Sequence, residues 1–188
     1  ISSMRYSSHT ITAGKAGLPA LPATWCHNDR EADSLCLVLE DSLTGLRLEL
    51  LYSIFNESGA LARSARLYNG GKQTLRIQRL LSACLDLPPQ DLDFIHFQGT
   101  WARERGLVRQ PIRGGTHLVE STRGVSSHQQ NPFIVLASPD CGEERGQAYG
   151  FNLVWSGNFI AGADIDQFGG ARVFIGTNPF DFSWKLES

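Results

Sequence analysis

Two aspartates near the end of the chain have the spacing of a carboxylate pair that could cleave a glycosidic bond. Asp164 and Asp166 are two residues apart in a stretch whose alternation predicts a strand. Side chains at this spacing leave the same face of a strand about 7 Å apart, a separation that inverting glycosidases use. Acidic side chains are mostly exposed, so a solvated strand face is the favoured interpretation here and at Asp181.

The histidines do not form a recognisable metal or catalytic pattern. They are His9, His27, His96, His117 and His128. A metal site needs three or four ligands, and only His27 has other donors nearby, Asp29 and Glu31. A surface loop is the favoured interpretation of that group. The sequence therefore predicts no metal ligand, no catalytic residue and no cofactor.

A polar run at residues 126–131 contains two serines and a histidine, which together could serve nucleophilic catalysis. The run lacks the GxSxG pattern that presents a nucleophilic serine. Short polar side chains also hydrogen-bond to nearby backbone. We therefore expect a loop whose side chains hold its own backbone in place.

The four tryptophans separate into two groups. Trp155 and Trp184 alternate with other apolar residues, which favours core packing. Trp101 follows Gly99-Thr100 at the end of an expected strand, and Trp25 lies at the edge of a loop. An indole face can stack on the apolar face of a sugar ring, and loops often carry function. For Trp25 and Trp101, two interpretations remain: the side chain lies in a pocket or on a partner surface, or it packs in the core.

A basic strip follows Trp101 in the sequence. It consists of Arg103, Arg105, Arg109 and Arg113. Salt bridges to nearby carboxylates would explain it, as would a subunit contact, since arginine is enriched at interfaces. The candidate substrate- or interface-facing residues are Trp101, Arg103, Arg105 and Trp25.

Composition excludes several classes of partner. The formal net charge is −2 and the pI is about 6.2, which argues against nucleic acid or an anionic membrane held by electrostatics. No apolar run is long enough for a membrane helix. The four cysteines fit no CxxC motif and are too sparse for a disulfide framework, so reduced thiols in a cytoplasmic protein are expected.

Alternating apolar residues predict a chain made almost entirely of strands. The expected strands cover residues 5–11, 35–39, 46–55, 61–68, 91–101, 116–122, 133–137, 159–165 and 171–175. Residues 74–87 are expected to be one bent strand, and 69–71 a hairpin turn. The charged, glycine-containing stretch at 103–115 is assigned to no strand.

The last forty residues are expected to organise the fold. Residues 149–155, 159–165, 171–175 and 180–186 alternate between short turn signals, which predicts a four-stranded antiparallel meander with one apolar face. Such a sheet needs a second layer. The predicted architecture is all-β: a large antiparallel two-sheet β-sandwich, with residues 1–188 as a single domain truncated at both ends.

Several motifs resemble the N-terminal domain of glycoside hydrolase family 36, the bacterial α-galactosidases. They are WARER at 101–105, STRGVSSHQQNPF at 121–133, YGFNLVWSGNF at 149–159 and NPFDFSWKLE at 178–187. LPAT at 21–24 and DSLTGL at 41–46 resemble earlier parts of the same domain. The resemblance extends over nearly the whole chain.

This resemblance implies a β-supersandwich similar to galactose mutarotase, preceding a (β/α)8 barrel. In the family, that barrel carries two catalytic aspartates and hydrolyses terminal α-linked galactose from melibiose, raffinose or stachyose with retention. The barrel motifs have no counterpart in this sequence. The implied partners are the missing catalytic barrel, galactosides through the parent protein, and other subunits, since family members form tetramers.

Three functional hypotheses follow. The first is a non-catalytic accessory and assembly domain of an α-galactosidase. The second is a stand-alone carbohydrate-binding module with Trp25 or Trp101 as its stacking platform. The third is an enzyme with mutarotase-like acid/base chemistry, which would need a His and a Glu converging in a cleft.

Overall fold

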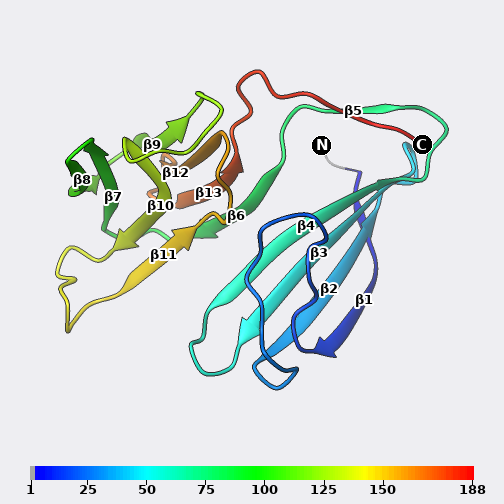
Figure 1. The fold of residues 1–188 in the computed structure, drawn as a ribbon, viewed down its shortest axis with the longest axis horizontal. Helices are drawn as coiled ribbons and strands as arrows, with labels where there is room; N and C mark the ends of the chain where they lie inside the picture. The colour runs from blue at the N-terminus through cyan, green and yellow to red at the C-terminus, as the bar shows by residue number, and fades with distance from the viewer. Residues whose placement is uncertain (1–2) are drawn as a thin grey trace. The chain divides into compact units, whose positions relative to one another are not determined.

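The computed structural model describes residues 3–188 and consists of β-strands joined by turns and loops. No helix occurs in that range, so none is available to cross a membrane. The prediction of an all-β chain is confirmed. The strands are labelled β1 to β14 in Figure 1.

The chain forms two compact units. The first consists of Ile1–Gln78 together with Ser183–Ser188, and the second of Arg79–Phe182. The backbone thus leaves the first unit after Gln78 and returns to it at Ser183. The expectation of one domain over residues 1–188 stays a prediction.

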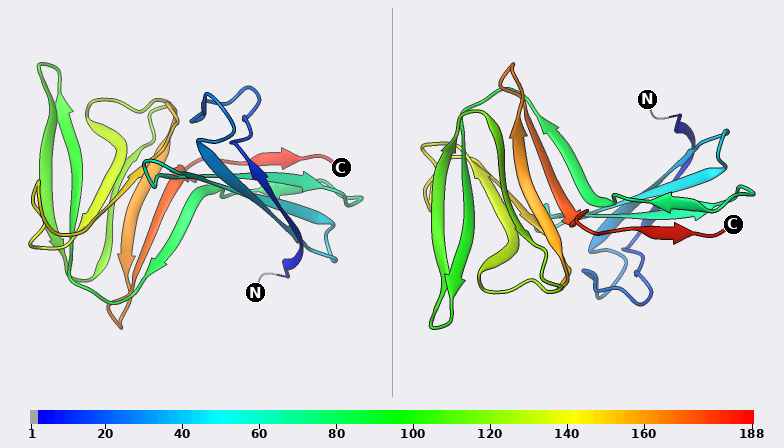
Figure 2. Two further views of the ribbon diagram at one scale, coloured as in Figure 1. Left: turned by 90° about the horizontal axis from the view of Figure 1, so that it is seen from below. Right: turned by 90° about the horizontal axis from the view of Figure 1, so that it is seen from above.

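The second unit is a sandwich of two four-stranded antiparallel sheets. One sheet has the order β11-β10-β7-β8, with strands Ala148–Asn152, Gln130–Ala137, Leu92–Thr100 and Arg103–Ile112. The other has the order β6-β13-β12-β9, with strands Leu81–Leu87, Ala171–Thr177, Phe159–Ile165 and Gly115–Ser121. Figure 2 shows the long β7–β8 hairpin in green.

Both sheets of the second unit contribute to one hydrophobic core. From the first sheet come Leu92, Phe94, Ile112, Ile134 and Leu136, and from the second Val119, Phe159, Ala161, Ala163, Ala171, Val173 and Ile175. Along β12, the core residues Phe159, Ala161 and Ala163 are every second residue, because the pleat sends successive side chains to opposite faces. The predicted sandwich is therefore present, with its core in this unit.

The first unit is built on a single sheet. Its order is β1-β2-β3-β4, with strands Arg5–Ala13, Ala32–Glu40, Leu46–Phe55 and Leu61–Asn69. A two-stranded ribbon pairs β14 (Trp184–Leu186) with β5 (Leu75–Ile77). All nine residues of β1 are exposed, and its position at the end of the sheet leaves one side of its backbone without a partner strand among the described residues.

Three local predictions were wrong. Residues 74–87 are not one bent strand: β5 pairs with β14 in the first unit, whereas β6 pairs with β13 in the second. The turn at 69–71 does not join paired strands, because β4 pairs only with β3. Residues 103–112, assigned to no strand, form β8.

The four-stranded C-terminal meander is also wrong. Only β12 and β13 pair with each other. β11 lies in the opposite sheet beside β10, and β14 belongs to the other unit. Alternation indicates that a segment is a strand with two different faces, but it does not say which strand it pairs with.

Candidate functional site

The most exposed tryptophan lies on the turn between β7 and β8. Thr100 and Arg103 are paired across the hairpin, so Trp101 and Ala102 are the two turn residues. Ala102 has a φ of 61°, and its N–H donates to Oε1 of Glu104 at 2.9 Å. The indole of Trp101 is 91% exposed, so both its faces are accessible to a ligand or partner.

A glycine determines the shape of this hairpin. The strand register shifts between Gln98 and Thr100, which places Gly99 at an irregularity of the kind that aims nearby side chains. A Cβ atom at Gly99 would lie 2.5 Å from the carbonyl oxygen of Arg103 and 2.8 Å from Cα of Glu104. The close backbone approach therefore requires glycine.

A polar hollow of about 470 Å³ adjoins the turn. Its lining residues are Gln98, Gly99, Thr100, Arg103, Gly106, Gln129 and Gln130. The three glutamines were not among the residues singled out from the sequence. Gln129 directly precedes β10 and Gln130 begins it. Strand pairing between Gln130 and Gln98 brings both to the hairpin.

The arginines of the predicted basic strip differ in their surroundings. Arg103 and Arg105 are exposed, and neither guanidinium group makes a hydrogen bond or ion pair with any residue from 3 to 188. Arg105 has a φ of 60°. Arg113 lies in a second hollow of about 560 Å³, near the β12–β13 turn. Free guanidinium groups of this kind are available to an external ligand.

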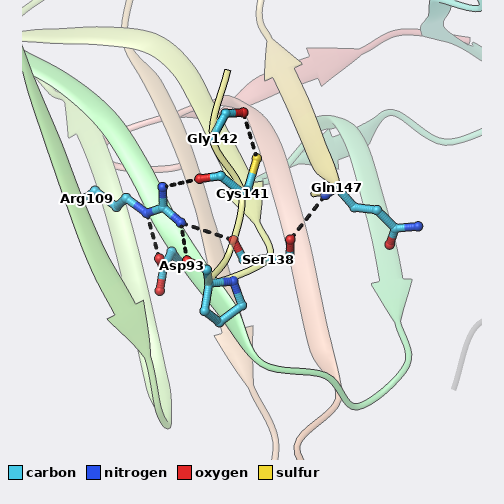
Figure 3. Close-up of polar contacts among 7 residues, drawn as sticks. Asp93, Arg109, Ser138, Cys141, Gly142 and Gln147 are labelled. Carbon is cyan, nitrogen blue, oxygen red and sulfur yellow. Dashed lines mark hydrogen bonds and ion pairs between the residues drawn. The ribbon is translucent and has the colours of Figure 1, made fainter. Parts of the chain in front are cut away.

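Arg109 has a structural role instead. Its Nε donates to Oδ2 of Asp93 on β7 at 2.6 Å, as Figure 3 shows. The remaining guanidinium nitrogens donate to three carbonyl oxygens of the β10–β11 loop, those of Cys141 at 2.7 Å, Ser138 at 3.0 Å and Pro139 at 3.0 Å. For this residue, the salt-bridge interpretation of the strip is confirmed.

We expect Arg109→Lys to lower the free energy of unfolding by about 1–3 kcal/mol, because the ammonium group of lysine cannot reproduce the four hydrogen bonds that the planar guanidinium group makes. Urea denaturation measures the change. Arg113→Lys is the matched control, since Arg113 is exposed without a hydrogen-bond partner in the described residues. Equal stability of the two variants would contradict the structural role of Arg109.

The other tryptophans lie away from this hairpin along the chain. Trp25 belongs to the first unit, is 67% exposed and contacts His27 edge-on at a ring distance of 4.2 Å. Trp155 and Trp184 are 40% and 62% exposed, so the expectation that they pack in the core is wrong. Trp155 lies three residues after the end of β11, and Trp184 begins the short β14, whose first two residues are exposed.

The two aspartates of the predicted acidic pair make local hydrogen bonds. Asp164 and Asp166 are both exposed. Asp164 accepts a hydrogen bond from Thr116 at 2.9 Å. Asp166 lies in the β12–β13 turn, where Oδ1 accepts from the N–H groups of Phe168 and Gly170. Both carboxylates are exposed and hold local structure, which agrees with the solvated interpretation. The expectation that they share one strand face is wrong, because β12 ends at Ile165 and Asp166 lies in the turn.

The polar segment before β10 is held by its own side chains, as predicted. Ser127 accepts hydrogen bonds from the guanidinium of Arg123 and from the N–H of Gln129. Arg123 also bonds to Oε1 of Gln129. No group of three or more histidine, cysteine or acidic side chains that could hold a metal occurs within residues 3–188.

One histidine is buried in the sandwich. His96 lies on β7 beside Phe94 and is 8% exposed. Its Nδ1 has no hydrogen-bond partner in the part of the chain that is described. Burial lowers the pKa of His96, and an interaction with the backbone of Phe97 acts weakly in the opposite direction. The imidazole is therefore held in its neutral form.

This lowered pKa predicts a pH dependence of stability. The unfolded chain binds a proton at His96 near pH 6.5, whereas the folded chain does so only at lower pH. The free energy of unfolding therefore falls as the pH drops below 6.5 towards the folded pKa. His96→Leu should remove this part of the slope in urea titrations between pH 7.5 and 5. If the free energy of unfolding of the variant depends on pH as steeply as that of the parent chain, the role of His96 is refuted.

Comparisons with known proteins extend over the full chain. The model of the glycosyl hydrolase family 36 N-terminal domain matches residues 1–187. Alpha-galactosidase AgaA of Geobacillus stearothermophilus is 46% identical over 187 residues, which are 100% of this chain and 26% of the relative. A probable alpha-galactosidase G of Aspergillus terreus is 38% identical over 186 residues, which are 99% of this chain and 26% of that relative.

Solved structures agree with the sequence comparison. The crystal structure of AgaA matches with a TM-score of 0.97 over 100% of this chain and 26% of that chain. The alpha-galactosidase of Lactobacillus brevis matches with a TM-score of 0.96 at 43% identity. The match covers 100% of this chain and 25% of that chain. The chain thus spans about a quarter of the length of the relatives that it matches.

Proposed function

Because the chain belongs to the family of glycosyl hydrolase family 36 N-terminal domains, we propose that it is a non-catalytic accessory and assembly domain of an α-galactosidase. The observation that carries the proposal is the match over 100% of this chain to only 26% of an α-galactosidase. The site chemistry supports it, because the carboxylates Asp164 and Asp166 are exposed and bonded locally.

In this proposal, the reaction belongs to a catalytic barrel in the parent protein. The parent hydrolyses terminal α-linked galactose from melibiose, raffinose and stachyose. Variants of the relative AgaA have been crystallised in complex with stachyose and with raffinose. The sandwich contributes a rigid support and a surface for the barrel, for which a core built from both sheets is well suited.

We extend the proposal to a cytoplasmic homo-oligomer. Four free cysteines support the reducing compartment. The exposed edge strand β1 and the unpaired arginines on the β7–β8 hairpin support contacts between subunits. Light scattering of the parent protein tests the assembly, and a strictly monomeric parent would refute this extension.

A chimera tests the accessory role. We would replace the matching 26% of AgaA with this chain and measure raffinose hydrolysis. The chimera should hydrolyse raffinose, whereas AgaA lacking this region should lose activity and this chain alone should have none. Full activity of the shortened AgaA, or hydrolysis by this chain alone, would refute the proposal.

A further inference from the structure

We propose that one face of the β1–β4 sheet (Figure 1) is a docking surface for the rest of the parent polypeptide, outside residues 1–188. This surface, the leucine face, carries Leu35, Leu37, Leu39, Leu48, Leu50 and Leu67. The strand register places them together, because residues paired across neighbouring strands share a face. The face itself follows from the structure, whereas the identity of the parent as an α-galactosidase rests on the proposed function.

The leucine face is open, although it is the more apolar side of the sheet. The buried strand residues of this sheet are Ala32, Val38 and Ser53. All three lie on the opposite face, because successive residues of a strand point to opposite sides. On the leucine face, Ile11 is 71% and Leu61 is 59% exposed. An apolar sheet face normally packs on a second layer, and the described residues do not provide one here.

The loop between β1 and β2 is bonded to the opposite face. Oγ of Ser34 donates to the carbonyl oxygen of Gly14 at 2.6 Å. Nη2 of Arg66 donates to the carbonyl oxygen of Gly17 at 3.1 Å. Ser34 and Arg66 both project away from the leucines, since Ser34 precedes Leu35 on β2 and Arg66 precedes Leu67 on β4. The chain thus places its own loop on one face only.

The position of the chain ends favours the same polypeptide as the partner over a second copy. Arg5, the first residue of β1, pairs with Glu40. The carbonyl oxygen of Leu186 accepts a hydrogen bond from Nδ2 of Asn69, the last residue of β4, at 3.0 Å. The register places Glu40 and Asn69 at one end of the sheet. Polypeptide continuing from either end is therefore held beside this face at a high effective concentration.

The relatives contain enough chain to cover the face. They match over only 26% of their length, so about three quarters of such a protein lies outside the matched region. A second copy would have to associate from dilute solution, whereas this remaining chain is covalently attached.

The charges on the leucine face permit an apolar partner. Its charged strand residues are Asp33, near the start of β2, and Arg63 on β4. Arg63 lies over the ring of Tyr52 at 5.4 Å, and its Nε donates to the hydroxyl of Tyr52 at 3.3 Å. An apolar layer can therefore cover the leucines without burying a row of charges.

Hydroxyl-radical footprinting tests the docking by comparing the 188-residue chain with the AgaA chimera. Tyr6 pairs with Leu39, so it lies on the leucine face, and it is 60% exposed. Tyr68 lies on the opposite face and is 44% exposed. Oxidation of Tyr6 should fall several-fold in the chimera, whereas oxidation of Tyr68 should stay the same. Equal oxidation of Tyr6 in the two proteins would overturn the proposal.

A matched pair of substitutions on β1 gives a second test. Ile11→Lys puts a charge on the leucine face, and Thr10→Lys puts the same charge on the opposite face of the same exposed strand. Neither change should shift the urea midpoint of the 188-residue chain. In the chimera, Ile11→Lys should lower the unfolding temperature, because a buried unpaired charge is costly, and Thr10→Lys should not. Equal effects of the two variants in the chimera would contradict the assignment.

Light scattering separates the remaining polypeptide from a second copy as the partner. Protection of Tyr6 in the chimera should persist on dilution, because the partner is part of the same chain. Protection that is lost on dilution, together with dimers of the 188-residue chain, would assign the leucine face to a second copy and overturn the proposal. Raffinose hydrolysis by the chimera reports separately on the accessory role.

Discussion

Phe159→Ala is expected to lower the free energy of unfolding by about 3–5 kcal/mol, the range for removing a buried aromatic ring. Phe159 begins β12 and is 0% exposed. It pairs with Thr177 on one side and Ser121 on the other, so the strand cannot shift easily to close the cavity. A loss of this size is a large share of the 5–15 kcal/mol that typically stabilises a domain.

Phe168→Ala is the matched control. Phe168 lies nine residues further on, in the β12–β13 turn, and is 77% exposed. The same atoms are removed, but from solvent, so the change should stay within about 0.5 kcal/mol. Urea denaturation followed by fluorescence measures both variants. A loss below 1 kcal/mol at Phe159 would show that the sandwich core is not closed around this ring.

The strands that pack on a core could be predicted from the sequence, because burial of one face imposes a period of two. Along β12, Phe159, Ala161 and Ala163 are buried, as their alternation predicts. Pairing could not be predicted in this way. The stretch at 180–186 alternates perfectly, yet only Trp184–Leu186 forms a strand, and it pairs with β5. The choice of partner depends on residues more than one hundred positions away.

Edge strands leave little pattern in the sequence. β8 is the outer strand of its sheet, and nine of its ten residues are exposed or half-buried, so no apolar face marks it. Pro111 resembles a loop signal, but an edge strand tolerates proline where its N–H would face solvent. For this reason, residues 103–112 were not recognised as a strand.

The candidate site was partly accessible from the sequence. Trp101 and Arg103 could be singled out because a tryptophan at a strand end, beside arginines, is unusual for a core. The glutamines of the hollow could not, because strand pairing between Gln130 and Gln98 brings them to the hairpin. The role of Trp101, Arg103, Arg105 and Trp25 in binding stays a prediction.

A buried amide near the end of the second unit also escaped the sequence analysis. Asn178 is 3% exposed and follows the last residue of β13. Its Nδ2 donates to Oε2 of Glu120 at 2.9 Å and to the carbonyl oxygens of Phe159 at 3.2 Å and Ser121 at 3.4 Å. Its Oδ1 accepts from the N–H of Phe180 at 2.9 Å. One side chain thus joins β9, β12 and the segment after β13.

Asn178→Asp is expected to destabilise the chain by about 3 kcal/mol or more at pH 7, because it replaces a donor with a buried negative charge. The new carboxylate would face the carboxylate of Glu120 and two carbonyl oxygens, all of them acceptors. Burial and a neighbouring negative charge both raise the pKa of an aspartate. Its protonation would restore a donor, so the loss should shrink as the pH falls.

Urea denaturation of Asn178→Asp and of the parent chain at pH 7 and pH 5 tests this. Asn178→Ala removes the same bonds without adding charge, so its loss should be smaller at pH 7 and should change little with pH. The difference between the two variants isolates the cost of the charge. An Asp variant that is as stable as the Ala variant at pH 7 would show that Asn178 opens to solvent and does not hold the three segments together.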